Sequence, residues 1–117
     1  DRSALESIVD AMRAVNATRP LFVKIAPDLE FEAVDEVIGM ALDKGLTGLI
    51  ATNTTLSRAG LQTPPSAGGE YETGGLSGAP LTKRADEVLG YVAKHVSGKM
   101  TLIGVGGVGD KETYLRK

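Results

Sequence analysis

The sequence contains no cysteine, and aromatic side chains make up only 4% of its 117 residues. The lack of cysteine excludes thiolate catalysis, cysteine-ligated zinc and a disulfide framework within these residues. No charge of one sign dominates, because 13 basic side chains are offset by 15 acidic ones, so we expect no nucleic-acid partner. Long apolar runs and a signal peptide are also missing, so the sequence predicts no membrane-spanning helix within these residues.

The composition is that of one soluble globular unit, with 42% hydrophobic side chains and a net charge of -2. The chain opens with Asp1 and Arg2 rather than with methionine. We therefore expect a processed product or a piece of a longer protein.

Hydrophobic periodicity predicts helices and strands in strict alternation. The predicted elements are helices over 5–15, 31–42 and 81–96, a possible helix from Asp110, and strands over 21–27, 48–53 and 101–106. Ser3 and Glu6 have the spacing of a capping box at the first helix, and Gly45 stands where a left-handed residue often ends a helix. Residues 56–80 are rich in Gly, Pro, Ser and Thr, which predicts an ordered loop or small hairpin excursion.

This alternation is typical of a parallel sheet with right-handed crossovers. A doubly wound sheet and a (β/α)8 barrel both have it, and both collect ligands at the carboxyl ends of their strands. Three strands leave open edges and an uncovered face, whereas a complete barrel needs roughly 250 residues. We therefore predict that residues 1–117 are a fragment of an α/β (β/α)8 barrel.

Lys24 interrupts an apolar run, 21–27, that is typical of a buried strand. A buried ammonium loses hydration at a cost of several kcal/mol unless an anion or hydrogen-bond acceptors replace the water. The sequence therefore predicts a ligand or a partner carboxylate beside Lys24. A lysine that protects a sheet edge, or half of a structural ion pair, is the alternative.

Four motifs carry a resemblance to one enzyme family. They are VKIAPDL at 23–29, IATNTTLSR at 50–58, ETGGLSGAPL at 72–81 and IGVGGV at 103–108. In order and spacing they resemble the quinone-dependent (class 2) dihydroorotate dehydrogenases. The resemblance covers nearly the whole chain and is weaker over 109–117.

The resemblance implies the later middle part of a barrel that binds flavin mononucleotide (FMN). It implies oxidation of dihydroorotate to orotate in pyrimidine biosynthesis, with a quinone as electron acceptor. It also implies peripheral attachment to the cytoplasmic face of a bacterial inner membrane, or to the mitochondrial inner membrane, through an amino-terminal segment absent here. The family's catalytic base is a serine upstream of these residues, so we assign neither Ser57 nor Ser77 that role and expect no turnover and feeble flavin binding from the fragment alone.

By similarity, Lys24 would lie beside the flavin ring and tune its redox potential, because a cation stabilises the negative charge of the reduced ring. Thr52 would contact the flavin, while Asn53 and Thr54 would bind orotate or dihydroorotate through hydrogen bonds. For an isolated Thr-Asn-Thr-Thr stretch, a turn that merely caps the loop is the better interpretation.

Two glycine-rich motifs can form a phosphate cradle, because their amides can approach phosphate oxygens closely. The resemblance assigns Gly78 and Gly107 to the flavin phosphate, with Ser77 and Gly106 beside them. Tight turns without a ligand are the commoner role of such glycines. The series from Gly104 to Gly109 also satisfies G-x-G-x-x-G, but that motif alone is a weak indication of a dinucleotide site.

Other candidate sites are weaker. His95 is the only histidine, and we expect it to have a surface or packing role. No metal site is predicted, and the acidic residues around Glu30–Glu36 complement a helix dipole. We expect Arg58 to order its loop through an ion pair, for which the sequence names no partner. Another FMN-dependent barrel oxidoreductase, such as a class 1 dihydroorotate dehydrogenase or a dihydropyrimidine dehydrogenase, stays open, as does a non-catalytic phosphate-binding or nucleotide-binding module.

Overall fold

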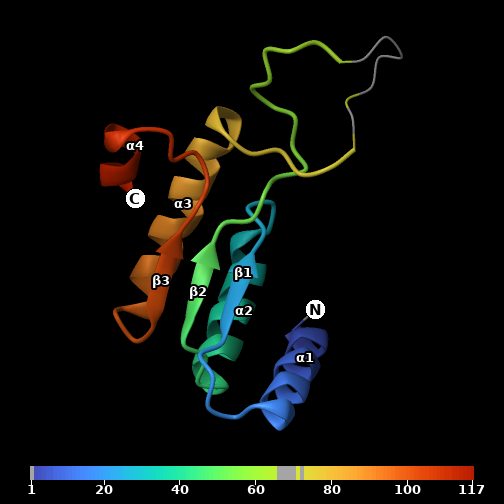
Figure 1. The fold of residues 1–117 in the computed structure, drawn as a ribbon, viewed down its shortest axis with the longest axis vertical. Coiled ribbons are helices and arrows are strands. Elements are labelled where there is room, and N and C mark those ends of the chain that lie inside the picture. The colour runs from blue at the N-terminus through green and yellow to red at the C-terminus, as the bar shows by residue number, and fades with distance from the viewer. Residues whose placement is uncertain (1, 66–70, 72) are drawn as a thin grey trace.

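The computed structural model describes residues 2–65, 71 and 73–117 (Figure 1). Helices and strands alternate as predicted. In chain order they are α1 (Arg2–Val15), β1 (Phe22–Ile25), α2 (Phe31–Asp43), β2 (Gly48–Ala51), α3 (Ala79–Val96), β3 (Thr101–Gly104) and α4 (Lys111–Arg116). Among these described residues, no helix is both long and apolar enough to cross a lipid bilayer.

The three strands form one parallel sheet in the order β1-β2-β3. In the register, Lys24 lies opposite Ile50, and Ile50 lies opposite Ile103. Because all strands run the same way, their carboxyl ends meet at one edge of the sheet, the upper edge in Figure 1. The predicted polar residues of β2 and the glycines after β3 follow this edge.

The hydrophobic core lies between α2, α3 and one face of the sheet. Its buried residues include Ile25 and Leu49 from the strands, Ile38 from α2 and Val92 from α3. Successive strand residues point to opposite faces, so Lys24 lies on the other face together with Ile50 and Ile103. Ile103 is 40% exposed, which shows how open that face is in the described part of the chain.

The prediction that Lys24 is buried within these residues is therefore wrong. Lys24 is exposed, although the next residue, Ile25, is 3% exposed. Hydrophobic neighbours in the sequence could not distinguish a strand buried on both faces from one buried on a single face. The sequence correctly predicts the side of the sheet on which Lys24 lies. This is the face opposite the helices, which is the face that lines the interior of a complete barrel.

α1 lies beside α2 rather than against the sheet (Figure 1). Arg2 contacts Asp43 at 2.7 Å, and Lys44 contacts Asp10 at 2.8 Å; the hydrogen bond to Asp10 raises the pKa of Lys44. The predicted capping box at Ser3 is wrong, because the helix already includes Arg2 and Ser3 lies in its first turn.

The predicted end of α2 is confirmed, with Gly45 at φ +60°. β3 ends at Gly104, two residues earlier than predicted.

Candidate functional site

The segment after β2 ties the carboxyl ends of all three strands together. The Thr52 amide donates to the Val105 carbonyl at 2.9 Å, and the Asn53 amide donates to the Ile25 carbonyl at 2.7 Å. Thr52 is 1% exposed and its hydroxyl donates to the Asn53 carbonyl at 2.9 Å. The side chains of Asn53 and Thr54 are exposed, so they are available to a ligand at this edge.

The third motif returns to this point from a distant part of the sequence. Thr55 and Leu76 exchange two backbone hydrogen bonds of 2.9 and 2.7 Å in an antiparallel bridge. Gly75 lies against Thr54, since a Cβ on Gly75 would fall 1.9 Å from the Thr54 hydroxyl oxygen. The bridge therefore closes the predicted 56–80 excursion at its base and places the glycine motif beside the end of β2. Residues 66–70 and 72, which belong to the predicted excursion, lie outside the described residues.

A cleft of about 780 Å³ lies between the start of α3 and the loop that joins β3 to α4. All four residues that were predicted to form the phosphate cradle line it: Ser77, Gly78, Gly106 and Gly107. Gly78 and Gly107 both have positive φ, at +81° and +68°. The structure thus brings together two motifs that are separated by more than twenty residues in the sequence.

The cleft has the chemical character of an anion site. Gly78 precedes the 18-residue helix α3 and caps it without a side-chain hydrogen bond. Pro80 has no amide hydrogen and the Leu81 amide donates to the Gly78 carbonyl at 3.0 Å, so Ala79 and the glycine loops supply the amides nearest the helix start. Backbone amides and the helix dipole favour an anion at such a position. Gly107 approaches Thr82 of α3 so closely that a Cβ would lie 2.6 Å from the Thr82 Cα. Glycine is therefore needed there to close the cleft.

The far wall of the cleft includes α4. Asp110 accepts a hydrogen bond from the Thr113 amide at 2.8 Å and forms a capping box with Thr113. That backbone hydrogen bond is the main cause of the lowered pKa of Asp110. At the other end of α4, the Lys117 ammonium lies 2.6 Å from Asp86 of α3. These contacts hold α4 against α3 beside the glycines.

Lys24 does not line this cleft, and neither does Thr52, Asn53 or Thr54. Lys24 projects from the middle of β1 on the open face of the sheet, while the residues after β2 lie at the edge between β1 and β3. The predicted site residues therefore form two groups. One group is the glycine cleft at the start of α3. The other group comprises Lys24 on the open face of the sheet and the residues Thr52, Asn53 and Thr54 that follow β2.

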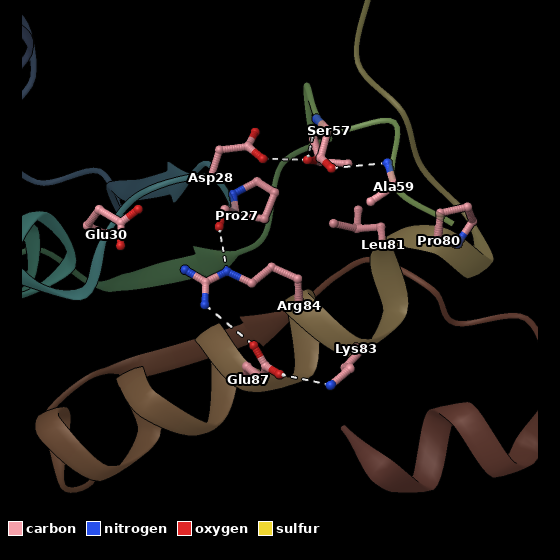
Figure 2. A pocket seen from close by; sticks show the side chains of 11 residues that line it. Pro27, Asp28, Glu30, Ser57, Ala59, Pro80, Leu81, Lys83, Arg84 and Glu87 are labelled. Atoms are coloured by element: carbon pink, nitrogen blue, oxygen red, sulfur yellow. Dashed lines mark hydrogen bonds and ion pairs between the residues drawn. The ribbon is translucent and has the colours of Figure 1, made fainter. Parts of the chain in front are cut away.

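A second hollow, of about 550 Å³, lies between the loop after β1 and the first turns of α3 (Figure 2). Asp28 and Arg84 project from opposite sides of it. Arg84 donates to the carbonyls of Pro27 and Leu29, each at 2.8 Å. Asp28 belongs to the motif at 23–29, but the sequence predicted no role for it and no role for Arg84. Nothing in the local sequence links residues that are more than fifty positions apart.

The weaker candidates have structural contacts. His95 is exposed and stacks on Tyr91 at a centroid distance of 4.0 Å. Desolvation, and then a hydrogen bond to Asp35, raises the pKa of Tyr91. Arg58 donates to the Gly74 carbonyl at 2.6 Å, which links the two ends of its loop through a backbone carbonyl; the expected ion pair stays a prediction. Within the described residues there is no group of three acidic or histidine side chains that could hold a metal ion.

The family model for dihydroorotate dehydrogenase matches residues 1–113 of this sequence. The chain belongs to the dihydroorotate dehydrogenase family. A quinone-type dihydroorotate dehydrogenase of Nocardioides sp. is 55% identical over 108 residues, which are 92% of this chain and 30% of that protein. The mitochondrial quinone-type enzyme of Cyclocybe aegerita is 54% identical over 99 residues, which are 85% of this chain and 29% of that protein.

Solved structures of dihydroorotate dehydrogenase share the fold. The ligand-free enzyme of Eimeria tenella matches with a TM-score of 0.87 and 33% identity, over 99% of this chain and 36% of that chain. The same enzyme in complex with ferulenol matches with a TM-score of 0.81 and 31% identity, again over 99% of this chain and 36% of that chain. The chain thus spans about a third of its structural neighbours and about 30% of its curated relatives. Its strands and helices are those of one part of a (β/α)8 barrel.

Proposed function

We propose that these residues are part of an enzyme that oxidises dihydroorotate to orotate in pyrimidine biosynthesis, with FMN as cofactor and a quinone as electron acceptor. The glycine cleft carries this proposal, because Ser77 and Gly78 line it from one side and Gly106 and Gly107 from the other. Relatives whose names specify the quinone reaction support the choice of acceptor. The partners are then dihydroorotate, orotate and the quinone.

The cleft fits the phosphate group of FMN. Glycines with positive φ present their amides without a side chain in the way, and the start of α3 adds its helix dipole. Gly78 and Gly107 would hold the phosphate oxygens, with Ser77 and Gly106 adjacent. A serine hydroxyl can donate a further hydrogen bond to a phosphate oxygen.

The isoalloxazine ring of FMN, when bound, supplies a hydride acceptor. In this proposal Lys24 lies beside that ring and favours its reduction through its positive charge. The buried Thr52 contacts the ring from the end of β2. The exposed Asn53 and Thr54 bind the pyrimidine and its carboxylate by hydrogen bonds and hold the substrate against the ring.

The proton that leaves dihydroorotate needs a base, and we place that base outside these residues. Ser57 and Ser77 are both exposed, and the Ser57 oxygen accepts a hydrogen bond from the Ala59 amide at 3.2 Å. His95, the only histidine of the sequence, lies in the last turn of α3 and stacks on Tyr91, so it gives neither serine the partner that a serine base would use. We propose an upstream serine as the base and a peripheral membrane location, bacterial or mitochondrial, through a segment outside these residues.

The proposal is tested on the holoenzyme that contains these residues at its full natural length. We expect FMN to copurify and its 450 nm absorbance to bleach when dihydroorotate is added without oxygen. A quinone should then restore the absorbance faster than fumarate or NAD⁺. A preference for fumarate or NAD⁺ would indicate a class 1-like enzyme, and bound flavin that does not bleach would indicate a binding module; both outcomes contradict the proposal.

A further inference from the structure

We infer that Asp28 is a positioning residue for substrate, because its carboxylate fixes the turn that presents Asn53 and Thr54. This inference rests on the proposed function, which places the substrate at those two side chains. Asp28 itself touches neither the cleft at α3 nor the exposed side chains of Asn53 and Thr54. It acts on the residues that come directly after them.

Both oxygens of the Asp28 carboxylate hold the same turn. The Thr55 hydroxyl donates a short hydrogen bond to Asp28 Oδ1, and the Leu56 amide donates to Asp28 Oδ2 at 3.0 Å. Thr55 is 6% exposed, so its hydroxyl has little access to water as an alternative partner. Hydrogen bonds to a charged group are about twice as strong as neutral ones, and two from one turn restrict both its position and its orientation.

The end of β1 and the loop that follows it thereby hold the substrate segment at two points. Before the segment, the Ile25 carbonyl accepts the Asn53 amide at 2.7 Å. After the segment, Asp28 holds Thr55 and Leu56. The first anchor is on Asn53 itself and the second begins at Thr55, so the two residues proposed to bind substrate are the anchored Asn53 and Thr54, which lies between the anchors. A change at Asp28 therefore releases one of the two anchors.

Arg84 of α3 keeps Asp28 in place from the opposite side of the hollow (Figure 2). Its guanidinium donates to the carbonyls of Pro27 and Leu29, the residues on either side of Asp28. It also lies 4.8 Å from the centroid of the Phe31 ring and 3.4 Å from Glu87. Arg84 of α3 thus holds the backbone on both sides of Asp28. The Asp28 carboxylate in turn holds Thr55 and Leu56, which form the turn after β2.

The test compares three variants of the full-length holoenzyme. Asp28→Asn cannot accept from both donors, because its amide nitrogen is itself a donor. Thr55→Val removes the donor hydroxyl with little change of shape, and Thr55→Ser keeps it. We expect Asp28→Asn and Thr55→Val to raise the KM for dihydroorotate and the Kd for orotate by about 10- to 100-fold. The FMN content and the KM for the quinone should stay unchanged, and Thr55→Ser should behave like the wild type.

Glu30→Gln is the matched control, because Glu30 is an exposed carboxylate that lines the same hollow. It should change none of these values. Both changes remove the hydrogen bond between Asp28 and Thr55. Asp28→Asn also disturbs the one from the Leu56 amide, and Thr55→Val also removes the acceptor of the Ser57 amide, so the loss in the double variant should be smaller than the sum of the two single losses. The inference is overturned if KM and orotate affinity stay at wild-type values in either single variant, whether or not FMN content or thermal stability falls. Failure of the proposed function is distinct, because the wild-type holoenzyme itself would then not oxidise dihydroorotate.

Discussion

Gly107 lies against Thr82 so closely that no side chain fits between them. A Cβ on Gly107 would fall 2.0 Å from the Thr82 hydroxyl oxygen and 2.6 Å from its Cα, and Gly107 has φ +68°. The Thr82 backbone belongs to α3 and cannot rotate away. We therefore predict that Gly107→Ala displaces the β3–α4 loop from α3, and that the left-handed conformation alone costs about 1–2 kcal/mol. The holoenzyme should melt at a lower temperature and purify with less FMN, as measured by thermal unfolding and the ratio of 450 to 280 nm absorbance.

Gly109→Ala is the matched control for this prediction. Gly109 lines the same cleft, two residues further along the loop, but a Cβ there has no atom within 4 Å and its φ lies outside the left-handed range. This variant should keep normal FMN content and stability. Equal losses in the two variants would show that the loop tolerates no added methyl group anywhere, and the specific contact with Thr82 would then not be the cause.

Replacing Lys24 tests whether the open face of the sheet is the flavin face. Lys24→Met keeps most of the side-chain length and removes the charge. We predict that the midpoint potential of the bound flavin falls and that its reduction by dihydroorotate slows by at least about tenfold, because developing negative charge loses its counter-charge. Potentiometric titration and stopped-flow absorbance measure these two quantities.

Lys83→Met is the control for Lys24, because the Lys83 side chain is 91% exposed on the outer surface of α3. It removes the same charge from the whole protein, but from a side chain on α3 and not from the open face of the sheet. If both variants lower the potential equally, the effect comes from net charge and the proposed place of Lys24 beside the ring is wrong.

The sequence was sufficient for those features that depend on local pattern. The alternation of elements followed from periodicity, and the glycines that meet in the cleft were recognisable because they follow a strand or precede a helix. The direction of Lys24 also followed from strand alternation, but its exposure did not, since that depends on what covers the second face of the sheet. α1 has the same limitation: its pattern is amphipathic, yet Val15 on the apolar face is 89% exposed.

Contacts between distant side chains could not be predicted. Asp28 and Thr55 are separated by 27 positions, and each residue alone is ordinary for a loop. Arg84 reaches two backbone carbonyls, which carry no signal in a sequence because every residue has one. These contacts hold the turn after β2. The arrangement of the candidate site could therefore be determined only from the three-dimensional structure.

The chain by itself should be inactive. Its sheet has one open face with Ile103 40% exposed, and it spans about 30% of the length of the Nocardioides enzyme. We predict no dihydroorotate oxidation and only weak FMN binding from the 117 residues alone, measured by dye reduction and fluorescence titration. Replacing the matched stretch of the Nocardioides enzyme by these residues should give an active, FMN-containing chimaera. Turnover by the isolated chain, or a chimaera that folds but binds no FMN, would contradict the proposal.

The contact between Asp110 and Thr113 predicts how the wall of the cleft responds to acid. The Thr113 amide donates to the Asp110 carboxylate, and this hydrogen bond lowers the pKa of Asp110 in the folded protein. A carboxylate with a lowered pKa stabilises the fold at pH values above its unfolded pKa, and this contribution is lost as the pH falls through the folded value. The start of α4 should therefore be protected at neutral pH and loosen only below pH 3.8, the ordinary value for this group.

Amide hydrogen exchange at Thr113, measured by NMR as a function of pH, reports this loosening after correction for intrinsic exchange. Asp110→Asn should keep the cap at neutral pH, because asparagine is an equally good N-cap, and should abolish the dependence on acid. Asp110→Ala should expose the Thr113 amide at every pH. If the acid response persists in Asp110→Asn, another carboxylate controls α4; the candidates are Glu112 in its first turn and Asp86, which pairs with Lys117 at the other end of the helix.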